Sequence, residues 1–284
     1  MSSRLENLLN SDYNWNSLLA LIEQGERLTD SQVGYVSVDW IDLFGGDFPS
    51  TVQLNTLKSG NLINCRSTNS SSGSAPHSTL LHWALIENQL EEVKRVLDAG
   101  IDPNVRGRFG LTALGALLPY SKIDLNNPFP VDAFCLLLDK GADINDHSPV
   151  INSIVSFSFL VSYPSIEKTL SAEKIALLWQ KIDEAGINWD KIDNLERNIQ
   201  IMFLEQSEPS IEVGRRLIDR GVSFNGRFMY EDKWRSYRDY CSQFEPGALD
   251  VLQQLQKMEK SQLVQKKLQA QTPVACVAVR RPRL

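Results

Sequence analysis

Cysteine and histidine are both scarce in this sequence, which contains four cysteines and three histidines among its 284 residues. The cysteines, Cys65, Cys135, Cys241 and Cys276, lie far apart and form no C-x-x-C pair. This spacing suggests neither a disulfide framework nor a zinc ribbon, and a reducing compartment fits it best. We therefore expect a cytoplasmic protein without a bound metal or cofactor.

Basic residues are also in short supply, because 29 Lys and Arg stand against 35 Asp and Glu, which gives a net charge of −6. The sequence pI is near 5.2. Nucleic-acid binding needs clustered Lys and Arg to neutralise phosphates, so this balance argues against a nucleic acid as the partner. Arg280, Arg281 and Arg283 fall within the last five residues, so the rest of the chain is more acidic still.

Long apolar runs are missing as well. The N-terminal stretch MSSRLENLLNSD has neither the apolar segment nor the small-residue cleavage site of a secretory signal. The most apolar window, VINSIVSFSFLV at 150–161, is too short and too rich in serine to cross a bilayer, which takes about 20 apolar residues. We expect no membrane span.

Catalytic motifs are absent too, since the sequence has no G-x-x-x-x-G-K-[ST] loop, H-E-x-x-H helix, G-x-S-x-G elbow or kinase signature. A cysteine nucleophile needs a nearby histidine to form its thiolate, and Cys65 with His77 is the candidate pair. His77 follows a serine-rich stretch, which holds catalytic geometry poorly. We predict that the protein is not an enzyme, and a cysteine-dependent enzyme is the less favoured alternative.

What the sequence does contain is one recurring turn. The segments KSGNLIN, DAGIDPN, DKGADIN, EAGINWD and DRGVSFN each place Asn or Asp four residues after a glycine. The pairs are Gly60 and Asn64, Gly100 and Asn104, Gly141 and Asn145, Gly186 and Asp190, and Gly221 and Asn225, with a fainter copy at Gly25. Self-similarity at intervals of 35 to 45 residues predicts a stacked array of repeats.

Most of these glycines follow an amphipathic run, such as LEEVKRVLDA before Gly100. Apolar residues three and four apart, here Leu90, Val93 and Leu97, form one face of a helix. Glycine then ends the helix, because it enters the left-handed region without the roughly 1 kcal/mol that a Cβ costs there. The recurring Asn side chains are expected to hydrogen-bond backbone groups in each turn, because a catalytic group is needed only once.

The segment TLLHWA, Thr79 to Ala84, resembles the T-P-L-H-x-A signature of an ankyrin repeat, with Leu80 in place of proline. The following NQLEEVKRVLDAGIDPN is similar to the second helix and turn of that repeat, and TALGAL at 112–117 is a degraded copy of the signature. The resemblance implies that His82 hydrogen-bonds backbone between neighbouring repeats.

The resemblance to ankyrin-repeat proteins implies an all-α solenoid of stacked helix pairs with short β-hairpin loops and degenerate helical caps at both ends. It is strongest at 79–116 and 131–145. The predicted organisation is an N-terminal helical cap at 1–47, ankyrin repeats at 48–227, a C-terminal helical cap at 228–270 and a flexible basic tail at 271–284.

Such proteins bind partners through hairpin tips and the concave face of their first helices, so positions that the fold does not fix are the candidate contacts. These are Ile86, Glu87, Arg106, Arg108, Phe109, Leu111 and Tyr120. Arginine beside aromatic residues is typical of interface hot spots. Phe109 and Leu111 are the most specific candidates, unless a neighbouring hairpin covers them. NGRFMYEDKWRSY at 225–237 repeats the pairing, either on the same surface or as part of the cap.

We therefore predict a monomeric, non-enzymatic module that binds another protein. The irregular repeats and long insertions also resemble those of bacterial ankyrin proteins, including effectors that are delivered into a host cell and act by binding host proteins. On that alternative, the tail VACVAVRRPRL carries the delivery signal. Deleting residues 271–284 would then abolish delivery and leave folding and partner binding intact.

Overall fold

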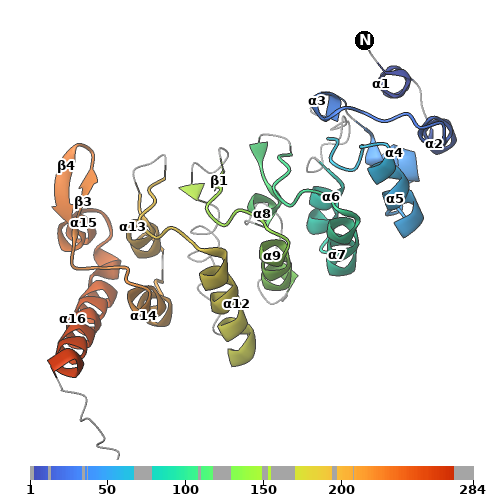
Figure 1. The fold of residues 1–284 in the computed structure, drawn as a ribbon. Coiled ribbons are helices and arrows are strands. Elements are labelled where there is room, and N and C mark those ends of the chain that lie inside the picture. The colour runs from blue at the N-terminus through green and yellow to red at the C-terminus, as the bar shows by residue number, and fades with distance from the viewer. Residues whose placement is uncertain are drawn as a thin grey trace, which may run out of the picture. The chain divides into compact units, whose positions relative to one another are not determined.

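The computed structural model divides the chain into two compact units, Met1–Leu195 (unit 1) and Glu196–Leu284 (unit 2). Helices predominate in both, and each unit also contains a short antiparallel hairpin (Figure 1). The residues that the structure describes are 3–11, 14–33, 36, 38–66, 79–107, 110–117, 129–148, 153–154, 170–193, 197–206 and 208–271.

Unit 1 consists mainly of short helices. They are α1 (Arg4–Leu9), α2 (Trp15–Glu23), α3 (Asp30–Val33), α4 (Trp40–Phe44), α5 (Thr51–Ser59), α6 (Leu80–Ile86), α7 (Leu90–Ala99), α8 (Ala113–Ala116), α9 (Phe129–Asp139) and α12 (Ala172–Ala185), with strands β1 (His147–Ser148) and β2 (Ser153–Ile154). The side chains of Ser50, Thr79 and Ser171 cap α5, α6 and α12 by accepting a backbone N–H bond. Such a cap stabilises a helix by about 1 kcal/mol, which explains why the helices begin at these residues.

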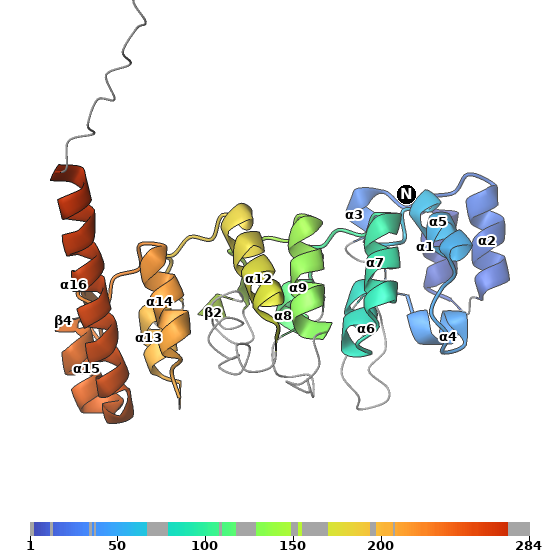
Figure 2. The ribbon, with the colours of Figure 1, turned by 90° about the horizontal axis from the view of Figure 1, so that it is seen from below.

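Helices that follow one another in unit 1 bury their apolar faces against each other. α6 packs on α7 and α8, α7 also packs on α5 and α9, and α9 packs on α12 (Figures 1 and 2). Val93 and Leu97 of α7 are buried, as the amphipathic pattern predicts, and Leu137 of α9 is fully buried. Burying a side chain of this size contributes roughly 1.5–3 kcal/mol, so these contacts hold adjacent helices together.

Asparagine side chains connect one turn of unit 1 to the next. Asn104 accepts a bond from the Asp143 N–H at 2.7 Å and donates to the Gly141 carbonyl at 3.0 Å. Asn145 repeats both bonds one turn later, to Asn188 at 2.7 Å and Gly186 at 3.1 Å. Asn64 accepts from the Asp102 N–H at 2.9 Å. The prediction that these amides satisfy backbone groups is confirmed, and we call Asn64, Asn104 and Asn145 the asparagine ladder.

The glycine turns are confirmed with one exception. The left-handed conformation, with positive φ, is found at Gly25, Gly100, Gly141, Gly186 and Gly221. At Gly60 the prediction is wrong, because φ is −78° and the next residue, Asn61, takes the left-handed conformation instead. Gly60 is needed for space, since a Cβ there would lie 2.9 Å from the side chain of Ile22. Asn61 is held by a 3.0 Å bond from its amide to the Leu28 carbonyl.

Unit 2 contains two short helices, a β-hairpin and a long C-terminal helix. They are α13 (Ile199–Leu204), α14 (Ile211–Asp219), β3 (Arg227–Tyr230), β4 (Lys233–Ser236), α15 (Tyr237–Phe244), the 3₁₀ turn η2 (Pro246–Ala248) and α16 (Leu249–Gln271). α16 packs on both α14 and α15 (Figure 2). Gly214 allows this close approach, because a Cβ there would lie 2.6 Å from the Leu255 side chain.

The segment predicted as a helical cap, 228–270, is helical from Tyr237 onward but begins with the β3–β4 hairpin. Its two central residues, Glu231 and Asp232, have φ of 49° and 58°, which is the geometry of a type I′ turn. Aromatic residues on both sides of the turn favour strands over a helix. Local turn chemistry therefore overrides the helical expectation at this point.

The last of the recurring asparagines, Asn225, has a different partner from the asparagine ladder. Its amide donates to the Glu259 carboxylate of α16 at 2.8 Å. The same carboxylate accepts from the Phe224 N–H at 2.9 Å and the Ser223 hydroxyl at 2.6 Å. The prediction that each recurring Asn side chain bonds a backbone group is therefore wrong at Asn225, where the Glu259 carboxylate takes the place of the glycine carbonyl that accepts from Asn104 and Asn145 in unit 1.

Candidate functional site

His82 serves the fold. The ring is fully buried, and its Nε2 lies 3.0 Å from the Leu111 carbonyl, which can only accept. Nε2 therefore carries the hydrogen, and Nδ1 accepts from the Thr79 hydroxyl at 2.8 Å. Burial lowers the pKa of His82 to about 4, so the ring is neutral at pH 7. Both ring nitrogens are occupied, and the predicted structural role of His82 is confirmed.

The described cysteines are poor nucleophiles. Burial raises the pKa of the Cys65 thiol to about 12 and those of Cys135 and Cys241 to about 11. Thiols with such pKa values stay protonated near pH 7, whereas the thiolate is the reactive form. His77 and Cys276 lie outside the described residues. Across the described stretches, no three His, Cys, Asp or Glu side chains are grouped so that they could hold a metal ion.

Arg106, predicted as a partner contact, is engaged within unit 1. Its guanidinium forms an ion pair with Asp146 and donates to the Gly110 carbonyl at 2.8 Å. Asp146 is buried and also accepts from the Thr112 hydroxyl at 2.9 Å. Arg106 thus joins the segment before α8 to Asp146, the residue before β1, and a partner that used Arg106 would compete with these bonds.

The other predicted contacts do not form one exposed cluster among the described residues. Ile86 is half-buried at the end of α6, and Glu87 next to it is exposed. Leu111 is half-buried, and a Cβ on Gly115 would lie 2.7 Å from it, so it covers that glycine. Three further predicted contacts, Arg108, Phe109 and Tyr120, lie outside the described residues and remain predictions.

A second surface is built on the β3–β4 hairpin of unit 2. One face of the hairpin points inward: Phe228 stacks on Tyr237 with ring centroids 4.8 Å apart and meets Tyr240 edge-on at 5.7 Å. The inward rings of the hairpin and the rings of α15 that they contact form one cluster. We call it the hairpin anchor, and it consists of Phe228, Tyr230, Tyr237, Tyr240 and Phe244. Aromatic pairs in this geometry contribute about 0.5–1.5 kcal/mol beyond their burial, so the hairpin is firmly attached to α15.

The opposite face of the hairpin presents large apolar side chains to solvent. Met229 and Trp234 are cross-strand partners, and their residues are 42% and 60% exposed. Arg227 lies on the same face and donates to the Trp234 carbonyl at 2.9 Å. We call Arg227, Met229 and Trp234 the hairpin face. An exposed tryptophan beside a methionine on a rigid strand pair is suited to contact another apolar surface.

The sequence pointed to this segment but not to Trp234. The signal that could have identified it is the alternation of side chains along two strands joined by a two-residue turn. With Phe228 inward, Met229 points outward, and pairing across the turn places Trp234 on the same side. Arg227 and Arg235 then fall on opposite faces of the hairpin, although each of them stands beside an aromatic residue in the sequence.

None of the helices in the part of the chain that the structure describes has both the length and the apolar character needed to cross a membrane. No protein-family model matches the sequence, and a search of curated proteins gave no match either. The candidate function therefore rests on the chain's own geometry.

Proposed function

We propose that this chain is an ankyrin-type repeat protein that binds another protein and has no catalytic activity. The recurring bonds of the asparagine ladder support a repeated unit, because the same amide bonds the same two positions of the following turn at Asn104 and at Asn145. The bond from His82 to the Leu111 carbonyl supports the ankyrin assignment, because the resemblance implies such a bond. Recurring helix pairs that bury each other's apolar faces are consistent with a stacked array.

The hairpin face is the observation that carries the binding function. A solvent-exposed tryptophan keeps a large apolar area in water, and covering it by a partner gains free energy in proportion to that area. The hairpin anchor fixes the strands before binding, so little conformational entropy is lost when a partner docks. Tryptophan is also among the residues most enriched at interface hot spots.

The absence of catalysis is supported by the chemistry of the described nucleophiles and bases. Burial raises the pKa of the Cys65 thiol to about 12 and lowers the pKa of His82 to about 4, and both ring nitrogens of His82 are already bonded. These environments stabilise the uncharged, unreactive forms. Cys65 and His82 are therefore suited to packing and not to catalysis.

Affinity capture with the full chain tests this function. The double variant Trp234→Ala, Met229→Ala is compared with wild type and with Leu177→Ala, which removes an exposed apolar side chain of α12 that is 45% accessible. We expect the double variant to recover at least about tenfold less of its partner, since a hot-spot residue contributes about 2 kcal/mol or more. Leu177→Ala should recover the wild-type amount.

Equal recovery by the double variant would contradict the assignment of the hairpin face. Recovery lost instead in Arg108→Ala, Phe109→Ala would place the contact on the predicted surface of unit 1. The hairpin-face double variant and Leu177→Ala should keep the wild-type melting temperature, because the side chains that they change are exposed.

Cytoplasmic location and delivery into a host cell remain predictions. The basic tail that would carry a delivery signal falls, from residue 272 onward, outside the described residues. Comparing delivery of the full chain with that of a chain lacking residues 271–284 tests the idea independently of partner binding.

A further inference from the structure

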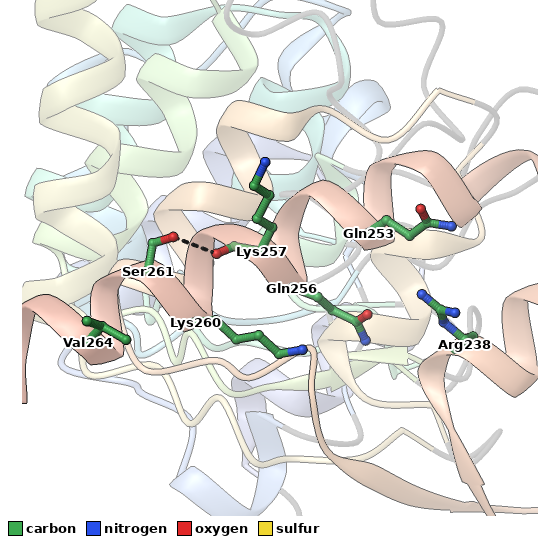
Figure 3. Close-up of a pocket in the computed structure, with 7 residues that line it drawn as sticks. All are labelled: Arg238, Gln253, Gln256, Lys257, Lys260, Ser261 and Val264. Atoms are coloured by element: carbon green, nitrogen blue, oxygen red, sulfur yellow. Dashed lines mark hydrogen bonds between the residues drawn. The ribbon is translucent and has the colours of Figure 1, made fainter.

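A groove of about 580 Å³ lies along the exposed face of α16, beside α15 (Figure 3). Its lining includes the cations Arg238, Lys257 and Lys260 together with the polar Gln253 and Gln256. In Figure 3 Lys260 and Gln256 extend from α16 toward Arg238, which reaches across from α15, while Lys257 extends on the other side of the helix. We call this feature the α16 groove.

The cations of the α16 groove have no carboxylate partner. Arg238, Lys257 and Lys260 are exposed, and their side chains make no hydrogen bond or ion pair with any residue that the structure describes. Other arginines of unit 2 are engaged: Arg197 pairs with Glu205, and Arg215 pairs with Glu212.

The nearest acidic side chain along α16, Glu259, does not line the groove and forms no ion pair with Arg238, Lys257 or Lys260. Its carboxylate is occupied by the Phe224 N–H, the Ser223 hydroxyl and the Asn225 amide. Among the residues that the structure describes, no Asp or Glu lines the groove itself. Arg238 and Lys260 therefore present positive charge toward one another without a carboxylate partner, in a chain whose total charge is −6.

We propose that the α16 groove binds an extended acidic segment of a protein partner. This inference rests on the proposed function, because it assumes that the partner is a protein. The lining runs from Gln253 to Val264, which corresponds to about 16 Å along a helix axis and matches about five residues of extended chain. A single anion would fill only part of that length.

The lining favours a peptide over a nucleic acid. Its described residues include no aromatic side chain on which a base would stack, whereas single-strand binding surfaces combine cations with such platforms. Glutamine side chains can both donate to and accept from peptide backbone groups. The groove thus offers cations for acidic side chains and amides for the backbone between them.

Fluorescence anisotropy with the full chain and a fluorescein-labelled peptide of six glutamates tests the proposal. We expect saturable binding that weakens as salt rises from about 50 to 300 mM, because exposed charges are screened. A peptide of six glutamines should bind at least about tenfold more weakly. The double variant Arg238→Gln, Lys260→Gln should lose about tenfold or more in affinity, since each exposed pair contributes up to about fivefold.

Lys266→Gln is the matched control. Lys266 lies on the same helix and does not line the α16 groove; it lines an adjoining hollow of about 430 Å³ that shares Lys260 with the groove, so Lys266→Gln removes one charge close to the groove without changing its lining. Its affinity for the six-glutamate peptide should stay within about twofold of wild type. A loss greater than about twofold in Lys266→Gln would overturn the proposal, because it would indicate a diffuse charge effect.

Three further outcomes are decisive. Absence of six-glutamate binding overturns the proposal, and so does displacement of the peptide by an equimolar thymidine oligonucleotide or by inorganic phosphate. Trp234→Ala should leave six-glutamate binding unchanged, because Trp234 does not line the groove. Failure of the α16 groove is therefore distinguishable from failure of the hairpin face, which is judged by partner capture alone.

Discussion

Residues 1–195 contain 14 Lys and Arg against 24 Asp and Glu, a net charge of −10, whereas residues 196–284 contain 15 against 11, a net charge of +4. The two units also differ in what their polar side chains do. In unit 1, Asn104, Asn145 and Arg106 all bond to neighbouring turns. In unit 2, Trp234 and the cations of the α16 groove face solvent without such partners.

This difference separates residues that recur from residues that occur once. A side chain that repeats at every turn is used by the fold, because each turn presents the same backbone groups to satisfy. The hairpin face and the α16 groove are built from residues that do not belong to the recurring turn. Binding residues are therefore best sought where the repeated pattern ends.

The largest difference between the units is expected under acid, because all three histidines lie in unit 1. Burial holds the pKa of His82 at about 4, below the ordinary 6.5, so the unfolded chain takes up a proton first as pH falls. The contribution of His82 to the free energy of unfolding is fully present above pH 6.5. As the pH falls from 6.5 to about 4, this contribution decreases by about 3 kcal/mol.

Urea unfolding followed by tryptophan fluorescence measures this loss, since five of the six tryptophans lie in unit 1. His82→Gln removes the titrating ring and should flatten the pH dependence between pH 6.5 and 4. The same acid sensitivity in His82→Gln and wild type would show that carboxylates, not His82, control it.

A smaller difference is expected when equivalent asparagines are changed in the two units. Asn145→Ala removes bonds to both Asn188 and Gly186 and should lower the free energy of unfolding by about 1–2 kcal/mol. Asn225→Ala removes one bond to Glu259, which keeps its other two donors, and should cost about 0.5 kcal/mol. Urea unfolding of both variants gives the comparison, and equal costs would mean that the asparagine ladder has no special role in unit 1.

The smallest expected effect is a gain confined to unit 2. Asp232 has φ of 58° at the second central position of the β3–β4 turn, where glycine is favoured. Asp232→Gly should stabilise the hairpin by about 0.5 kcal/mol and slow amide exchange across β3 and β4 about twofold. Asp232→Ala serves as the control, because it keeps a Cβ at the same φ. Equal exchange in the two variants would contradict the turn assignment.

Features that depend on neighbouring residues along the chain were predictable from the sequence. The helix before Gly100 ends there because the glycine adopts a φ of 99°, and the three- and four-residue spacing of Val93 and Leu97 places them on the buried face. The Asn side chains were correctly assigned to turns because they recur at a fixed distance from a glycine.

Features that depend on distant residues were not predictable. Arg106 was expected to be free for a partner, but Asp146, 40 residues away in sequence, engages it. Gly60 was assigned a left-handed turn, whereas its lack of a Cβ makes room for Ile22. The α16 groove joins Arg238 to Lys260 only through the packing of α15 on α16, which no local pattern encodes.

The most direct test of the account is hydrogen exchange of the full chain, measured by mass spectrometry with and without its captured partner. If the hairpin face is the contact, amide exchange should slow in peptides covering Arg227–Ser236 and remain unchanged across Asp102–Leu117. Protection confined to Asp102–Leu117, with β3 and β4 exchanging at the free rate, would contradict the account and return the contact to unit 1.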